Sequence, residues 1–174
     1  RVLGLRADGE LGIEPLPELA RLRKHHQRWK NILLEEEAPQ FLTDLSSDTV
    51  ELCAEFEVGE AREVGLTLGH ISPGRRQIAV AYDHEAGRLR CAERSGKFRV
   101  LPGEDRLQLR IVLDRSVVEV YANGRVALTA GGDWLGAGEG TPEPGGGRTV
   151  TLHARGERVH ASAVDVWEMG SIWD

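Results

Sequence analysis

The sequence predicts an all-β fold, a two-sheet antiparallel β-sandwich with one short helix near the N-terminus. Two observations carry this prediction: apolar and polar residues alternate along many short segments, and turn-forming dipeptides separate those segments. The composition agrees, because 40% of the 174 residues are hydrophobic and 29% are charged, as in an ordinary globular chain. Many short strands at this spacing are typical of an antiparallel sandwich or barrel, here with about ten to twelve strands.

The alternation has a period of two residues. Successive side chains of a strand point to opposite faces of the sheet, so such alternation indicates a strand with one buried face. The clearest case is 107–113, where every second residue is Leu or Ile. Segments with the same spacing are Val64–Leu68, Ile78–Tyr82, Val118–Ala122, Val126–Leu128 and Val150–Ala154.

Turn signals lie between these segments. Asn123-Gly124 separates Val118–Ala122 from Arg125–Ala130, and both residues tolerate the positive φ that a two-residue type I′ hairpin turn requires. Three further dipeptides of this kind are Asp8-Gly9, Asp114-Arg115 and Arg155-Gly156. Each of them predicts a tight connection between antiparallel neighbours.

Two segments do not follow the strand pattern. Pro17–Lys24 has a proline at a first-turn position and leucines three residues apart, which predicts the short helix. Gly131–Gly147 contains eight glycines and two prolines in 17 residues without any period, so we expect a loop there.

Charge and composition exclude several classes of function. The net charge is −6 and a phosphate-binding basic patch is not evident, so we expect no nucleic-acid partner. The apolar runs are shorter than the about 20 residues that cross a membrane, so we expect no membrane partner. The chain begins at Arg1 without a leader pattern, and both a cytoplasmic and a secreted location stay open.

Neither cysteine nor histidine predicts a metal site, and we expect no cofactor. Cys53 is an even number of residues from the glutamates of its segment, so its thiol should lie on their outward face of the strand. Cys91 is two residues from Leu89, so its thiol should point inward. Two free thiols are therefore favoured over a disulfide. His25 and His26 are adjacent and would face opposite ways on a strand, so they could not chelate one ion together.

Glu119 and Trp134 are two of the candidates for carbohydrate contact. Glu119 alternates with Val118 and Val120, so its carboxylate lies on the outer face, where it either pairs with an arginine or accepts a sugar hydroxyl. Trp134 stands in the glycine-rich segment, where its ring either stacks on a sugar or packs against a neighbouring strand or domain.

The segment 114–124 reads Asp-Arg-Ser-Val-Val-Glu-Val-Tyr-Ala-Asn-Gly. It resembles the Asp-Arg-Ser-x-Val-Glu-Val-Phe signature in the C-terminal module of glycoside hydrolase family 32, with Tyr121 where Phe is common. Two flanking segments also resemble this module: Leu11–Leu19 followed by Leu22-Arg23 is similar to its join with the catalytic domain, and Val164–Met169 with Ser171–Trp173 is similar to its closing strand.

The resemblance implies a sandwich module, 25–174, preceded by a linking strand or hairpin and short helix, 1–24. It also implies that catalysis on β-fructosides resides in a separate N-terminal five-bladed propeller of the same parent chain. The catalytic motifs of that propeller, Trp-x-Asn-Asp-Pro, Arg-Asp-Pro and Glu-Cys, do not occur in this sequence, so we assign no catalytic residue.

The resemblance thus predicts a non-catalytic accessory module that stabilises the propeller. The alternative is a free-standing module that binds fructan (levan) or a sucrose-type carbohydrate. The candidate contacts for a carbohydrate are Asp114, Arg115, Glu119 and Trp134.

Overall fold

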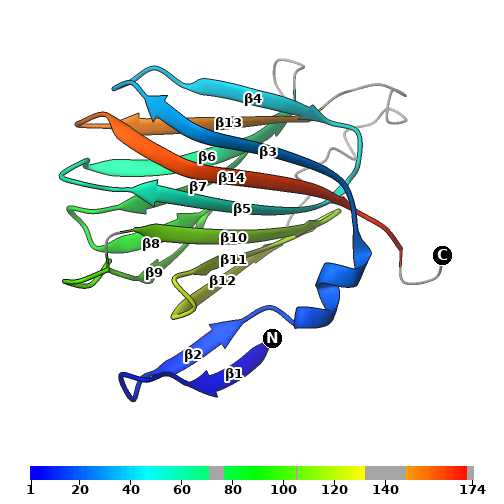
Figure 1. Ribbon diagram of the computed structural model, residues 1–174, viewed down its shortest axis with the longest axis horizontal. Coiled ribbons are helices and arrows are strands. Elements are labelled where there is room, and N and C mark those ends of the chain that lie inside the picture. Colours follow the sequence, from blue (N-terminus) through cyan, green and yellow to red (C-terminus); the bar gives the residue numbers. More distant parts are fainter. Residues whose placement is uncertain (71–76, 105, 132–147, 172–174) are drawn as a thin grey trace.

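The computed structural model describes residues 1–70, 77–104, 106–131 and 148–171. These residues form two six-stranded antiparallel sheets that pack face to face and a separate two-stranded hairpin at the N-terminus (Figure 1). The predicted all-β sandwich is therefore confirmed. In chain order the elements are β1 (Val2–Leu5), β2 (Leu11–Glu14), η1 (Pro17–Leu22), β3 (Arg23–Leu34), β4 (Gln40–Leu45), β5 (Thr49–Glu57), β6 (Glu63–His70), β7 (Ile78–Asp83), β8 (Arg88–Cys91), β9 (Arg94–Lys97), β10 (Leu107–Asp114), β11 (Val117–Ala122), β12 (Val126–Gly131), β13 (Arg148–Arg155) and β14 (Val159–Met169).

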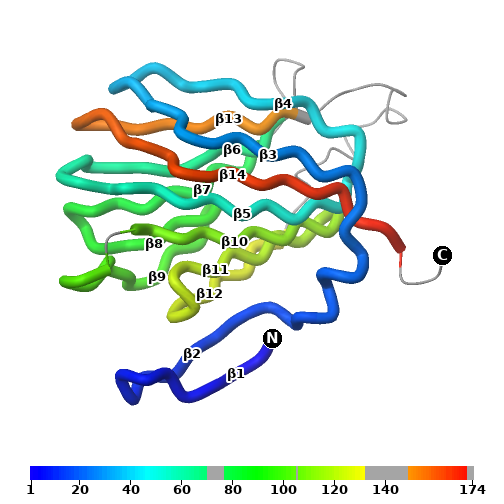
Figure 2. Tube along the Cα trace, in the orientation of Figure 1, coloured from blue at the N-terminus to red at the C-terminus, as the bar shows by residue number. Residues whose placement is uncertain are grey.

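The strand order explains how distant segments meet. The front sheet of Figure 1 has the order β12-β11-β10-β5-β14-β3, and the back sheet has the order β4-β13-β6-β7-β8-β9. The C-terminal strand β14 therefore lies between β3 and β5, which are early in the chain. Figure 2 follows the chain from the hairpin through η1 into β3, the edge strand of the front sheet.

The core lies between the inner faces of the two sheets. Leu52, Phe56 and Ile111 of the front sheet and Leu66 and Leu152 of the back sheet are completely or almost completely buried. Burial of such a side chain contributes about 1.5–3 kcal/mol each. The apolar residues that recur at every second position of the sequence therefore form the inner face of each strand.

The predicted short helix is present, but it ends two residues before Lys24. Pro17–Leu22 forms a short 3-10 helix with no buried residue, and Arg23 and Lys24 already belong to β3. These two residues pair with Met169 and Glu168 of β14, and the backbone N–H of Gly170 donates to the carbonyl of Leu22. Pairing with the C-terminal strand therefore ends the helix earlier than the local sequence predicts.

The Asn123-Gly124 turn also differs in one respect. Both residues have positive φ, 48° and 60°, as predicted. Ala122 pairs with Val126, however, so the connection contains three residues rather than two. The additional residue is Arg125, whose guanidinium donates to the Arg99 carbonyl and to Glu104, both at 2.6 Å.

The two cysteines are free, as predicted. Cys91 is buried in the core, and Cys53 is half-buried on the outer face of the front sheet. Burial raises the pKa of Cys53 to about 11, with a further contribution from the Glu51 charge. Of the predicted loop Gly131–Gly147, residues 132–147 lie outside the described residues.

Candidate functional site

The N-terminal hairpin lies against one end of the outer face of the front sheet. The backbone N–H of Ile13 donates to the Gly124 carbonyl at 2.8 Å, and the Arg6 guanidinium donates to the Asn123 carbonyl at 2.9 Å. The positive-φ turn therefore presents two carbonyl groups that anchor the hairpin. Figure 1 shows the hairpin below β11 and β12, outside both sheets.

Two cavities lie where the hairpin meets the sheet. The larger, of about 780 Å³, has six lining residues: Arg6, Glu57, Glu104, Arg106, Gln108 and Asn123. The smaller, of about 230 Å³, extends between Glu14-Pro15 and the outer faces of β5, β10 and β11, and it shares Gln108 and Asn123 with the first. We call the two cavities together the hairpin groove.

Asn123 lies where the two cavities of the hairpin groove meet. Its Oδ1 accepts a hydrogen bond from the backbone N–H of Gln108 at 2.7 Å, and its Nδ2 donates to the Arg106 carbonyl at 3.0 Å and to Glu104 at 3.2 Å. Arg125 donates to the same Glu104 carboxylate. These bonds hold the β11–β12 turn and the start of β10 in one position.

A buried charge cluster lies further along the same face. The Glu51 side chain is 0% exposed although its strand position points outward. It accepts two hydrogen bonds from Arg23, at 2.7 and 2.9 Å, and one from Arg110 at 2.5 Å. Burial alone would raise the pKa of the Glu51 carboxyl, but the two guanidinium groups outweigh burial and hold this pKa below its usual value.

Arg23 also connects this cluster to an aromatic pair. Its guanidinium lies 4.0 Å from the centroid of the Trp167 ring, which stacks on His26 at 4.7 Å and 6° between planes. His26 in turn contacts Asp165 at 2.6 Å. Because Arg23 directly follows η1, the cluster fixes the point at which the N-terminal segment enters the sandwich.

Glu119 lies on the outer face of β11, as its parity predicts. Its carboxylate accepts hydrogen bonds from Arg1 at 2.7 Å and from the Tyr121 hydroxyl at 2.6 Å. Burial and the bond to Glu119 raise the pKa of Tyr121 to about 12. Glu119 thus pairs with an arginine, which is one of the two alternatives that the sequence offers for it. A role in carbohydrate contact stays a prediction.

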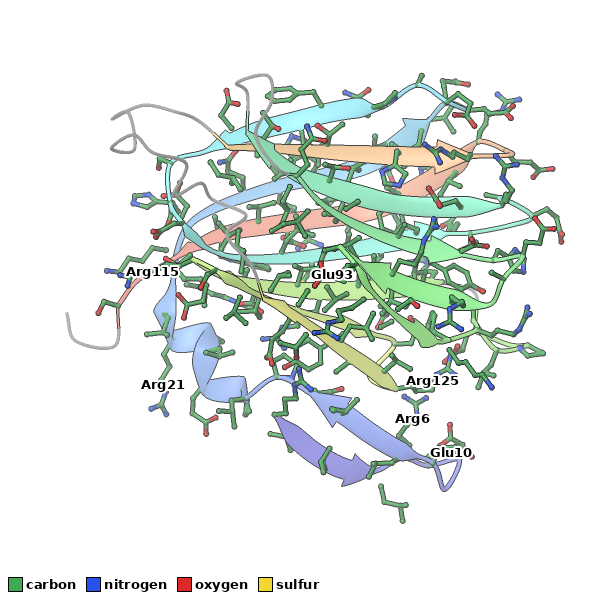
Figure 3. The ribbon with its side chains drawn as sticks, turned by 180° about the vertical axis from the view of Figure 1, so that it is seen from behind. Arg6, Glu10, Arg21, Glu93, Arg115 and Arg125 are labelled. Carbon is green, nitrogen blue, oxygen red and sulfur yellow. The ribbon has the colours of Figure 1, made fainter. Side chains whose placement is uncertain are left out.

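Two other candidates, Asp114 and Arg115, are not among the residues that line the hairpin groove. Asp114 and Arg115 lie at the β10–β11 turn, where the Arg115 backbone N–H donates to the Asp48 carbonyl at 2.9 Å. Figure 3 shows Arg115 at the opposite end of the molecule from Arg6 and Arg125. Trp134 lies outside the described residues. Asp114, Arg115 and Glu119 lie on one strand pair, β10 and β11, and its turn, and their role in carbohydrate contact stays a prediction.

The groove residues were not candidates in the sequence. The alternation in 107–113 predicts that Gln108 and Arg110 point outward, so the sequence does indicate that these two side chains are available on the outer face. The covering hairpin, however, is about a hundred residues away in sequence, because Arg6 and Asn123 are 117 positions apart.

Two negative findings apply to the described ranges. They contain no group of three or more His, Cys, Asp and Glu side chains that could hold a metal ion. Within the same ranges, none of the helical segments combines the length and the hydropathy that a membrane-spanning helix needs.

Comparison with known proteins gives the class. The model of the family described as "Glycosyl hydrolases family 32 C terminal" matches residues 18–131. The chain therefore belongs to this family, as the resemblance of its signature predicts. The match includes all but the first residue of η1 and the strands β3 to β12, and it leaves out the N-terminal hairpin, β13 and β14.

Individual relatives agree with this class. Levanase of Bacillus subtilis (strain 168) is 31% identical over 133 residues, which are 66% of this chain and 19% of levanase. The solved fructan 1-exohydrolase IIa from Cichorium intybus has a TM-score of 0.74 at 15% identity and matches 97% of this chain and 40% of its own. Fructosyltransferase from A. japonicus has a TM-score of 0.73 at 20% identity, and the match covers 98% of this chain and 31% of the fructosyltransferase chain. At these identities the solved structures support the fold, and this chain spans less than half of each relative.

Proposed function

We propose that this chain is a non-catalytic accessory module of a fructosidase-type glycoside hydrolase and stabilises the catalytic propeller by packing against it. The family match supports the module, and the small share of each relative that it spans supports a further domain in the parent protein. The division into a linking segment, 1–24, and a sandwich, 25–174, belongs to this proposal.

The apolar face of the hairpin carries the proposal. Leu3 pairs with Ile13 and Leu5 pairs with Leu11, so the four side chains share one face of β1 and β2. Leu3, Leu5 and Leu11 are 62%, 82% and 60% exposed. A two-stranded hairpin is marginally stable in water, and a contiguous exposed apolar face is typical of a partner site.

The leucines of the following segment, Leu16, Leu19 and Leu22, contribute less exposed surface than this face. Leu16 is exposed, whereas Leu19 and Leu22 are half-buried. The described ranges contain no element that covers Leu5, so a partner surface is the simplest means of removing it from water. A catalytic domain in the same parent chain would supply that surface.

The test is association with the family's catalytic domain, added as a separate chain. We expect the 174-residue chain to bind this domain and to raise its melting temperature. The double variant Leu5→Asn/Leu11→Asn should lose at least tenfold in affinity, because two leucines each lose a burial contribution of about 1.5–3 kcal/mol.

Phe41→Asn is the matched control, because Phe41 is also half exposed but lies on β4 of the back sheet. It should bind like the unmodified chain. The proposal is wrong if the catalytic domain does not bind, or if the leucine variant and the Phe41 variant bind equally well.

A further inference from the structure

We propose that the hairpin groove is a binding site for a neutral, linear oligosaccharide. The inference is independent of the packing role, because it concerns the space between the hairpin and the sheet and not the exposed leucine face. It also assigns carbohydrate contact to residues other than Asp114, Arg115, Glu119 and Trp134.

The shape of the groove fits a chain-like ligand. Its two cavities meet at Gln108 and Asn123 and extend from Glu57 at the end of β5 to Arg110 on β10. Volumes of about 780 and 230 Å³ lie in or near the range of about 300–1,000 Å³ that small-molecule sites occupy. A groove of this form accommodates several sugar units in a row.

The charges of the groove favour a neutral ligand. The larger cavity is lined by two arginines, Arg6 and Arg106, and by two glutamates, Glu57 and Glu104. The smaller cavity adds Glu14, Glu55 and Arg110, so a charged ligand of either sign would meet several like charges in the groove. A hydroxyl group both donates to a carboxylate and accepts from a guanidinium, so a polyhydroxylated ligand satisfies both kinds of side chain.

The lining residues divide into fixed and available groups. The Asn123 side chain uses its acceptor and its donors within the protein. The side chain of Gln108 is exposed, and the described part of the chain offers it no hydrogen-bond partner. Arg106 contacts Glu55 and Glu57 only at 3.3 Å, at the long end of the hydrogen-bond range.

Gln108 and Arg106 are therefore the expected ligand contacts, and Asn123 is the residue that positions them. Gln108 lies on the floor where the two cavities meet, so a ligand that occupies both must pass over it. Its backbone N–H donates to the Asn123 side chain, which fixes this part of β10 before a ligand binds. A fixed backbone lowers the entropic cost of binding, although the exposed side chain of Gln108 must still be ordered by the ligand.

The experiment is a titration of the chain with neutral and charged oligosaccharides, followed by backbone amide NMR shifts. The neutral probes are inulin-type fructo-oligosaccharides and cellohexaose, and the charged probe is tetragalacturonate. We expect at least one neutral probe to shift the amides of Arg106, Gln108 and Asn123 with saturation, and tetragalacturonate to cause no saturable shift.

Two variants and one control complete the test. Gln108→Ala removes one or two neutral hydrogen bonds, each a factor of about 2–12 in affinity, so binding should weaken at least about twofold. Arg106→Ala should weaken binding similarly. Gln40→Ala removes an exposed glutamine from β4, outside the groove, and should bind like the unmodified chain.

The inference is overturned if no neutral probe gives a saturable shift, if tetragalacturonate binds more tightly than every neutral probe, or if both groove variants bind like Gln40→Ala. Unchanged melting temperatures of the variants will show that lost binding is not lost folding. Because Leu5→Asn/Leu11→Asn leaves the groove residues intact, it should retain oligosaccharide binding even where it fails to bind a catalytic domain.

Discussion

Glu51 is a completely buried carboxylate on the outer face of the front sheet, and its replacement by glutamine is the sharpest test of the charge cluster. Glu51→Gln keeps the volume of the side chain but removes its charge. The amide NH₂ cannot accept a hydrogen bond, so at least one guanidinium bond from Arg23 or Arg110 is lost. Two positive groups are then left without their common partner.

The magnitude follows from burial. Breaking a buried ion pair on one side costs about 3–5 kcal/mol. Glu51 is completely buried, but the side chains of Arg23 and Arg110 are each 27% exposed and can regain some hydration. We therefore expect the free energy of unfolding to fall by about 2–3 kcal/mol, at or below the lower end of that range. For a chain of this length, this corresponds to a decrease of roughly 5–10 °C in melting temperature.

The assay is urea denaturation at pH 7, with Glu57→Gln as the matched control. Glu57 lies on the same strand and face, but its side chain is 45% exposed and its contact with Arg106 measures 3.3 Å. An exposed pair of this kind contributes about 0–1 kcal/mol. If Glu51→Gln is no more destabilising than Glu57→Gln, the cluster does not stabilise the fold and the reasoning fails.

The pH dependence provides a second check. The folded-state pKa of Glu51 is depressed, so its stabilisation is complete above the unfolded-state pKa of about 4.3 and decreases as the pH falls below it. The difference in stability between the unmodified chain and Glu51→Gln should be constant from neutral pH to about pH 5 and should shrink in more acidic solution.

Two further predictions concern the turn and the thiols. Gly124→Val should destabilise the chain by about 1–3 kcal/mol, because φ is +60° and an added Cβ would lie 3.1 Å from Oε1 of Glu14; an unchanged urea midpoint would contradict this. Cys53 is half-buried with a pKa of about 11, and Cys91 is buried with a pKa of about 12, so iodoacetamide at pH 8 should modify both slowly and Cys53 first. Mass spectrometry of the modified peptides measures the order, and faster modification of Cys91 would show that the core opens locally.

The sequence by itself determined the sheet faces and the turns. Alternation places Leu109 and Ile111 inward and Gln108 and Arg110 outward, because the side-chain period of a strand is fixed by its backbone geometry. The positive φ of Asn123 and Gly124 follows from residues that tolerate this conformation. These properties are local, so a single sequence is sufficient to predict them.

The sequence did not determine which strands become neighbours when no tight turn joins them. β3 carries mostly charged and polar residues and lacks a clear alternation, yet it is a twelve-residue strand because β14 pairs with it along almost its whole length. The 3-10 helix ends at Leu22 for the same reason. Pairing between the two ends of the chain outweighed the local helix signal of Pro17–Lys24.

Tertiary structure alone decided what covers the outer face. Parity places Glu51 outward, and an outward glutamate is ordinarily solvated, but Arg23 and Arg110 reach it from 28 and 59 positions away and bury it completely. The hairpin groove arises in the same manner, from Arg6 and Asn123 at a separation of 117 positions. Burial and cavity shape depend on contacts between distant segments, and a pattern of neighbouring residues carries no record of those contacts.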